Sequence, residues 1–141
     1  MLLIAGGLQG LGVSERDCVC ILMRNDIAFL EASYAVMLLG AYAVPINWHF
    51  TPEEAGYILA DSRAKVLVIH ADLLAQIASG IPLEMKVLVV PTPPEIGDAY
   101  GVPAERRSAS GAETWDDAES MQRFAKELVA QCFCQPIRSL F

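Results

Sequence analysis

The fold of this chain is decided by residues 12–78, GVSERDCVCILMRNDIAFLEASYAVMLLGAYAVPINWHFTPEEAGYILADSRAKVLVIHADLLAQIA. Apolar runs of strand length, at residues 18–23, 42–46 and 65–69, alternate here with stretches of helical spacing. A run that is apolar at every position is typical of a strand covered on both faces. Short strand-helix-strand repeats favour parallel strands and right-handed crossovers. The stretch therefore predicts an α/β fold built on a parallel sheet.

The helix expected after the first strand is unusually apolar. It begins after Asn25 and Asp26, which offer N-cap oxygens, and ends at Gly40. Large apolar residues recur in it at helical spacing, at Ile27, Leu30, Tyr34, Met37 and Leu38. Most of its other positions are Ala, Val or Leu. A helix that is apolar nearly all round is expected to be sandwiched inside its parent fold.

The start of the next helix carries the clearest local signal. In Thr51-Pro52-Glu53-Glu54 the threonine hydroxyl can accept a hydrogen bond from the Glu54 amide, and the Glu54 carboxylate can reach back to Thr51. Glu53 and Glu54 could also be read as a catalytic carboxylate pair, but capping and the helix dipole already explain them.

Further elements are expected on both sides of this core. The pattern predicts a helix over residues 3–11 ending at Gly12, a short helix over 72–78, a fourth strand over 85–90 and a helix over 115–130. Pro45 is expected at a strand end or edge, because it cannot donate to a ladder. Prolines and glycines after Val90 predict a surface excursion without regular structure.

Composition limits the functional classes. A chain of 141 residues suits a single domain. The net charge of −7 argues against a nucleic-acid binder or a polybasic membrane anchor. Residues 27–46 are apolar enough to be considered as a membrane span, but Glu31, Gly40 and Pro45 count against it. MLLIAGGL lacks the basic start of a secretory signal, so a cytoplasmic location is expected.

The candidate chemical residues are few. Cys18 with Cys20 and Cys132 with Cys134 would suit either buried free thiols or, with unusual spacing, a metal site. His49 follows a strand at the entry to the capped helix, where it would contact a ligand or else bond to the backbone. His70 is expected to be a solvated helix cap beside Asp72.

The order of these parts resembles a known family. The stretch GVSERDCVCILMRNDIAFLEASYAVMLLGAYAVPINWHFTPEEAGYILADSRAKVLV is similar to the N-terminal segment of the AMP-forming acyl-CoA synthetases, of the adenylate-forming superfamily. The resemblance implies an incomplete parallel β-α-β sheet, the first part of that family's large N-terminal domain. Residues 1–118 would form a partial AMP-binding domain, and residues 119–141 a divergent tail, helical and then irregular, as after a truncation or a shifted reading frame.

The resemblance also implies a function for the complete protein. Family members use ATP, Mg²⁺ and CoA to convert a carboxylate, such as a fatty acid, to an acyl-adenylate and then to acyl-CoA. The phosphate loop and catalytic motifs of the family are not found in this sequence, so no catalytic residue is carried over. His49 stands where the family often has an arginine, near the CoA phosphate in some members. Arg63 stands where a left-handed glycine is common.

Three interpretations follow from these observations. The chain is a piece of an acyl-CoA ligase that is inactive by itself, a non-catalytic module that pairs with a synthetase, or a product without its own function. Its partners would be the missing part of the synthetase or further copies of the chain. No nucleic-acid partner, membrane span or resident cofactor is expected.

Overall fold

The computed structural model describes residues 2–108, and the sheet at its centre has four parallel strands. Their order is β2-β1-β3-β4, and each neighbouring pair is parallel. The strands are β1 (Cys18–Leu22), β2 (Tyr42–Pro45), β3 (Val66–His70) and β4 (Lys86–Val90). The α/β fold and the parallel sheet expected from the sequence are confirmed.

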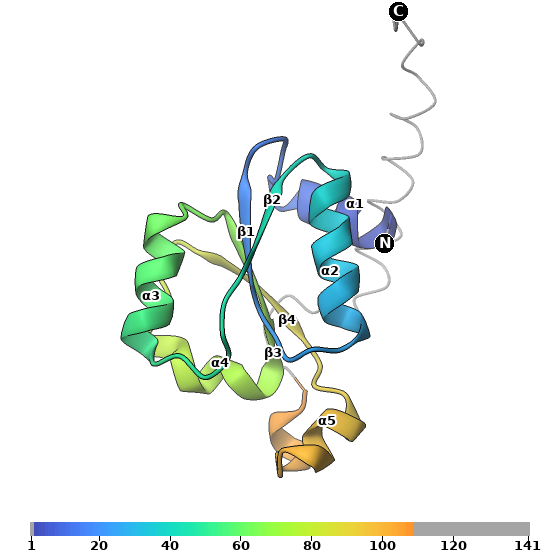
Figure 1. Ribbon diagram of the computed structural model, residues 1–141, viewed down its shortest axis with the longest axis vertical. Helices are drawn as coiled ribbons and strands as arrows, with labels where there is room; N and C mark the ends of the chain where they lie inside the picture. The colour runs from blue at the N-terminus through green and yellow to red at the C-terminus, as the bar shows by residue number, and fades with distance from the viewer. Residues whose placement is uncertain (1, 109–141) are drawn as a thin grey trace, which may run out of the picture.

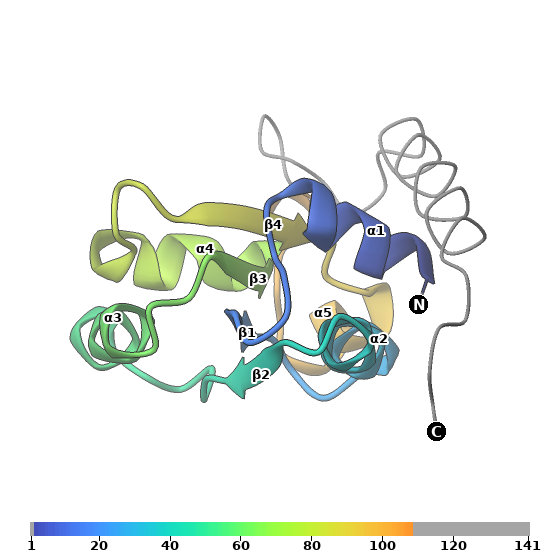
Figure 2. The same ribbon diagram turned by 90° about the horizontal axis from the view of Figure 1, so that it is seen from above.

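Helices cover both faces of this sheet. Helices α1 (Leu2–Gly10) and α2 (Ile27–Leu38) lie on one face, and α3 (Pro52–Asp61) and α4 (Ala71–Ile77) on the other (Figures 1 and 2). Successive strand residues point to opposite faces. Val19 and Ile21 accordingly join the core under α1 and α2, whereas Cys20 and Leu22 join the core under α3 and α4. This two-sided burial explains the continuous apolar runs.

The chain changes faces between β1 and β3. Helix α2 follows β1 on one face of the sheet, and α4 follows β3 on the opposite face, although β1 and β3 are neighbours. This arrangement is a topological switch point, and open α/β sheets bind ligands in the crevice outside the carboxyl ends of such strands. The residues that follow β1 and β3 are therefore the first place to look for a site.

Helix α2 is buried on one side only. The Asp26 carboxylate caps its start, accepting from the Phe29 backbone N–H at 2.8 Å. Its inward side chains, Ala32, Ala35 and Val36, are buried against the sheet and α1. The expected sandwich is half present, because no described residue covers the opposite face of the helix.

Helix α3 begins as the sequence predicts. The Glu54 backbone N–H donates to Thr51 Oγ1 at 3.3 Å, and the Thr51 backbone N–H donates to Glu54 Oε2 at 2.9 Å. Pro52 occupies the first turn, where its missing N–H leaves no partner unsatisfied. The reciprocal pair satisfies two helix-end donors, and this confirms the capping interpretation.

One expectation for the fold is wrong. The stretch after Val90 contains a helix, α5 (Pro94–Ala99), and a 3-10 turn, η2 (Ala104–Arg106), where an irregular excursion was expected. Pro94 stands at the first helical position, where a proline is tolerated because the N–H that it lacks would have no partner in the helix, so it begins α5 and does not break it. A further 3-10 turn, η1 (Ala78–Gly80), extends α4.

Several expectations fall outside the described residues. They are the helix at residues 115–130, the pair Cys132 and Cys134, and the boundary at residue 118. Of the helices that the structure describes, none has both the length and the apolar character that a membrane crossing requires.

Candidate functional site

A buried ion pair lies at the carboxyl ends of β1 and β3. Arg24 follows β1 and Asp72 lies in the first turn of α4, and Arg24 Nη1 is 2.6 Å from Asp72 Oδ2. Their side chains are only 8% and 4% exposed. A charge-assisted bond of this length, shielded from water, joins the two strands at the switch point.

Asp72 is held by two further elements. Its second carboxylate oxygen accepts from the Thr92 hydroxyl at 2.6 Å, and its backbone N–H donates back to Thr92 Oγ1 at 3.3 Å. Arg106 Nη2 donates to the Asp72 carbonyl oxygen at 3.2 Å. Asp72 thus connects α4 to the segments that follow β4, and both of its carboxylate oxygens are occupied.

His70 forms a second buried pair beside the first. Its Nδ1 accepts from the Arg24 backbone N–H at 3.2 Å, so the ring proton belongs on Nε2, which lies 3.2 Å from Asp26 Oδ2. Burial lowers the pKa of the His70 imidazole below its usual value of 6.5, against the opposing effect of Asp26. The expected solvated helix cap is therefore wrong: His70 is fully buried and its side chain makes no capping bond.

Two aromatic rings close over Arg24. Its guanidinium carbon lies 4.8 Å from the centre of the Trp48 ring and 4.6 Å from that of Tyr100. The two rings meet edge to face with centres 5.2 Å apart. Cation–π contacts with both rings shield the cation from water and hold the loop after β2 and the end of α5 together at the switch point.

The chemical capacity of this cluster is small. The carboxylates of Asp26 and Asp72 bind a helix end, His70, Arg24 and Thr92. Among the buried side-chain polar atoms of the described residues, Arg24 Nε is the one without a hydrogen-bond partner. Groups that are already paired with one another are not available to hold a phosphate or move a proton to a substrate. The sequence prediction missed Arg24, although a lone arginine directly after an apolar strand was a detectable signal.

His49 does not join the buried cluster. Its ring packs on Trp48 with centres 3.5 Å apart, its backbone N–H donates to Asn47 Oδ1 at 3.0 Å, and its side chain is exposed. The loop that carries His49 is bound to α4, because Gln76 Nε2 donates to the Trp48 carbonyl oxygen at 3.2 Å. His49 is therefore positioned at the carboxyl end of β2 and remains open to solvent.

The cysteines within the described residues are free thiols. Cys18 is half-buried, and burial raises the pKa of the Cys20 thiol, whose sulfur lies 3.4 Å from Ser62 Oγ. No group of three His, Cys, Asp or Glu side chains gathers to hold a metal ion within residues 2–108.

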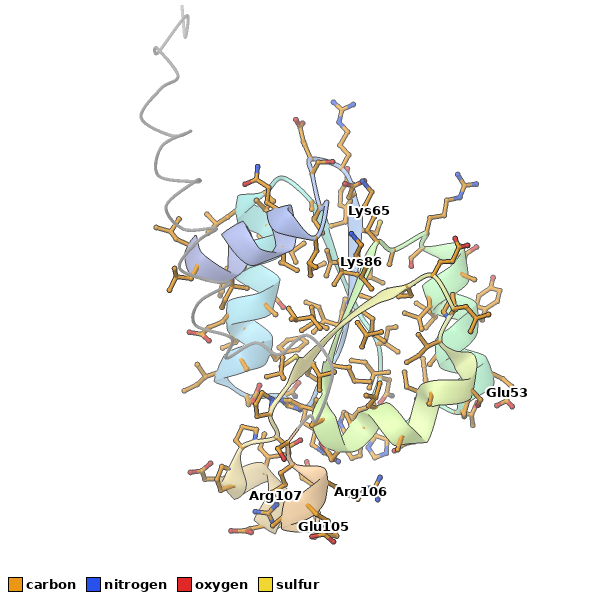
Figure 3. The ribbon with its side chains drawn as sticks, turned by 180° about the vertical axis from the view of Figure 1, so that it is seen from behind. Glu53, Lys65, Lys86, Glu105, Arg106 and Arg107 are labelled. Carbon is orange, nitrogen blue, oxygen red and sulfur yellow. The ribbon has the colours of Figure 1, made fainter. Side chains whose placement is uncertain are left out.

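The opposite, amino-terminal edge of the sheet carries a shallow groove of about 590 Å³. Lys65 and Lys86 lie there, at the far end of the molecule from Arg106 and Arg107 (Figure 3). Their ammonium groups donate to the carbonyl oxygens of Gly12 at 3.1 Å and Leu11 at 2.8 Å, which follow α1. The two ammonium groups therefore stabilise the end of α1. Lys65 and Ser14 also lower the pKa of Asp17 to about 2.

Comparison with known proteins decides the family. The model of the AMP-binding enzyme family matches residues 2–130. The chain belongs to the AMP-binding enzymes. A structure of the N-terminal domain of FACL13 from Mycobacterium tuberculosis superposes on this chain with a TM-score of 0.56 and 30% identity, covering 82% of this chain and 29% of that one.

Several curated relatives of this chain are CoA ligases. The long-chain-fatty-acid–CoA ligase FadD13 of Mycobacterium tuberculosis is 41% identical over 64 residues, which are 45% of this chain and 13% of that protein. The feruloyl-CoA synthase of an Amycolatopsis species is 39% identical over 80 residues, 55% of this chain and 16% of that protein. The chain thus spans less than a fifth of the length of either ligase.

Proposed function

We propose that this chain forms the first β-α units of an ATP-dependent acyl-CoA ligase, of the fatty-acid type, and is catalytically inactive by itself. In the complete ligase, a carboxylate would attack the α-phosphate of ATP, releasing pyrophosphate and forming an acyl-adenylate. The CoA thiol would then displace AMP to give the thioester. The contribution of these residues is the sheet on which the other parts are built.

This proposal is supported chiefly by the buried ion pairs that occupy the switch point. The crevice between β1 and β3, where an α/β sheet is expected to bind its ligand, contains the pairs Arg24–Asp72 and His70–Asp26. All four side chains are engaged with one another or with the backbone. A cluster of this kind braces the ends of two strands, which is the role of a scaffold.

The described residues do not fit the ATP phosphates or Mg²⁺. A magnesium site needs carboxylate oxygens that are free to bind the ion, whereas both oxygens of Asp72 are engaged and Asp26 binds a helix end and His70. We therefore assign the nucleotide and the metal of the complete ligase to residues outside this segment. No chemical step is assigned to the residues described.

For CoA we propose one contact. His49 would lie near a phosphate of the CoA nucleotide in the complete ligase, supported by its exposed ring and its position at the carboxyl end of β2. A histidine is a weaker partner for phosphate than an arginine, because it lacks the permanent charge and the forked donors. In the complete ligase, His49→Arg is expected to lower the KM for CoA and to leave the KM for ATP unchanged.

Pyrophosphate exchange tests the proposal. The 141-residue chain is incubated with ATP, Mg²⁺, labelled pyrophosphate and a set of fatty and aromatic acids. We expect no exchange above a blank without protein. We expect exchange to return when the chain is mixed with a FadD13-type ligase polypeptide that lacks the matching region. Exchange by the chain alone contradicts the proposed inactivity, and failure of the two polypeptides to associate contradicts the scaffold role.

A further inference from the structure

The exposed imidazole of His49 is connected to the buried ion pair through one aromatic ring. Asp72 Oδ2 lies 2.6 Å from Arg24 Nη1, and the Arg24 guanidinium carbon lies over the Trp48 ring, 4.8 Å from its centre. The Trp48 ring also packs against the His49 ring, with centres 3.5 Å apart. A continuous series of contacts therefore runs from a carboxylate side chain that is 4% exposed to an imidazole that is open to solvent.

Arg24 is itself held in place on several sides. Its guanidinium is bound by the Asp72 carboxylate, which also accepts from the Thr92 hydroxyl at 2.6 Å. Its backbone N–H donates to His70 Nδ1 at 3.2 Å, and its side chain is buried. Close packing and a charge-assisted hydrogen bond hold a side chain in one rotamer. The guanidinium is therefore a fixed support for whatever packs against it.

Two kinds of contact hold the loop after β2, and they fix different parts of it. Gln76 Nε2 donates to the carbonyl oxygens of Trp48 at 3.2 Å and Phe50 at 3.5 Å, which holds the backbone. These bonds do not set the side-chain torsions of Trp48, because the ring can turn while the carbonyl stays in place. The ring is contacted instead by the Arg24 guanidinium and by the edge of Tyr100. Arg24 thus holds the ring on its buried side.

The orientation of the His49 ring depends on the Trp48 ring. The His49 backbone N–H donates to Asn47 Oδ1 at 3.0 Å, whereas its imidazole makes no hydrogen bond to another of the described residues. An exposed side chain without a polar partner exchanges freely between rotamers. Stacking on the Trp48 ring removes part of that freedom, because only some rotamers of His49 keep the two rings in contact.

We propose that Arg24 is a positioning residue for His49: its guanidinium, fixed by Asp72, holds the Trp48 ring, and that ring sets the orientation of the imidazole. For the complete ligase this inference rests on the proposed contact of His49 with a phosphate of CoA, to which Arg24 contributes without touching the ligand. Such a contact depends on the orientation of one imidazole N–H, because hydrogen bonds weaken steeply as they bend.

Proton NMR of the full chain measures the position of the His49 ring. The chain has two histidines, so the variant His49→Gln assigns the ring signals. Protons above an aromatic face are shifted upfield, and we expect the His49 signals upfield of those in the urea-unfolded chain. Arg24→Met combined with Asp72→Leu, which leaves no buried charge unpaired, should move the signals towards the unfolded values. Asp98→Ala, which removes an exposed ion pair, is the matched control and should leave them in place.

A second variant serves if circular dichroism shows that the double variant does not fold. Arg24→Lys keeps a cation beside Asp72 but replaces the planar guanidinium with a compact ammonium group. The His49 signals should move in the same direction in this variant. Unchanged His49 signals in a folded variant that lacks the guanidinium overturn the proposal.

Kinetics of the ligase reassembled from this chain and a FadD13-type polypeptide test the functional part. We expect Arg24→Met with Asp72→Leu to raise the KM for CoA severalfold, and the KM for ATP less. In a chain that already carries His49→Gln, the same two substitutions should raise the KM for CoA no further, because both changes act on one contact. An equal rise in that background overturns the positioning role. Displaced NMR signals with an unchanged KM for CoA support the positioning of His49 and overturn its proposed contact with CoA.

Discussion

His70 Nε2 and Asp26 Oδ2 lie 3.2 Å apart and join the end of β3 to the first turn of α2. The other ring nitrogen of His70 accepts from the Arg24 backbone N–H, so the imidazole must stay neutral to keep both bonds. Protonation would place an N–H against an N–H in a buried site. The contact between the end of β3 and the start of α2 therefore depends on the charge state of one buried ring.

Acid is expected to destabilise the fold through His70. Burial lowers the pKa of His70 in the folded state below 6.5, its value in the unfolded chain. The unfolded state therefore binds more protons at mildly acidic pH. The His70 contribution is complete above pH 6.5 and is lost progressively as the pH falls below it. Urea unfolding at pH 7.5, 6.5 and 5.5 measures this slope. His70→Gln should flatten it, and the exposed His49→Gln should not; identical slopes in both variants would contradict the assignment.

The ion pair of Arg24 and Asp72 is expected to be the most sensitive polar contact. Asp72→Ala leaves a buried guanidinium without its counter-charge, and the free energy of unfolding should fall by about 3–5 kcal/mol. Asp98→Ala is the control, because Asp98 is 76% exposed in its pair with Arg107 and should contribute about 1 kcal/mol or less. Equilibrium urea denaturation gives both values.

Replacing both Arg24 and Asp72 distinguishes the loss of their attraction from the cost of leaving one buried charge unpaired. Arg24→Met combined with Asp72→Leu should recover much of the stability lost in Asp72→Ala, because no buried charge remains unpaired. If the double variant is as unstable as the single one, the loss belongs to the contacts with Thr92 and the rings rather than to the charge.

The sequence predicted the elements that depend on local pattern. The strand β1 followed from its apolar run, and the start of α3 from four consecutive residues that satisfy one another. These features depend only on residues that are close in the chain, so they can be predicted from the sequence.

The switch-point cluster was not predicted, because it depends on distant partners. Arg24 and Asp72 are separated by 48 positions, and Asp72 and Thr92 by 20. Only the strand order brings these residues together. The sequence around a histidine at the end of a strand is compatible with either a solvated or a buried ring. His70 was accordingly given the wrong environment.

Arg63 has a backbone conformation that side chains rarely adopt. Its φ of 51° is left-handed, a region that favours glycine. A side chain in this region raises the energy by about 1 kcal/mol, so Arg63→Gly should stabilise the fold by about that amount. Arg63→Ala keeps the strained Cβ and removes the charge. If thermal unfolding shows the same gain for the alanine variant, charge rather than backbone strain is responsible.

Gly80 is expected to resist any enlargement. A Cβ at this position would meet the carbonyl oxygen of Pro52 and lie 2.8 Å from its carbonyl carbon, so η1 would have to move away from the start of α3. Backbone atoms cannot turn aside as a flexible side chain can, and overpacking of this kind lowers stability by about 1–3 kcal/mol. Gly80→Ala should therefore lower the urea midpoint, while Ser79→Ala, at an exposed position, should leave it unchanged.

The packing of η1 against α3 allows a second test, at Gly56, in which two effects on stability oppose each other. In Gly56→Ala the better helix propensity of alanine would add about 1 kcal/mol to the stability of α3. The new Cβ, however, would lie 2.8 Å from the carbonyl oxygen of Gly80. We expect the clash to outweigh the propensity, so that the variant is less stable than the wild type. A gain in stability would mean that η1 can withdraw from α3 at little cost, and Gly80→Ala should then be tolerated as well.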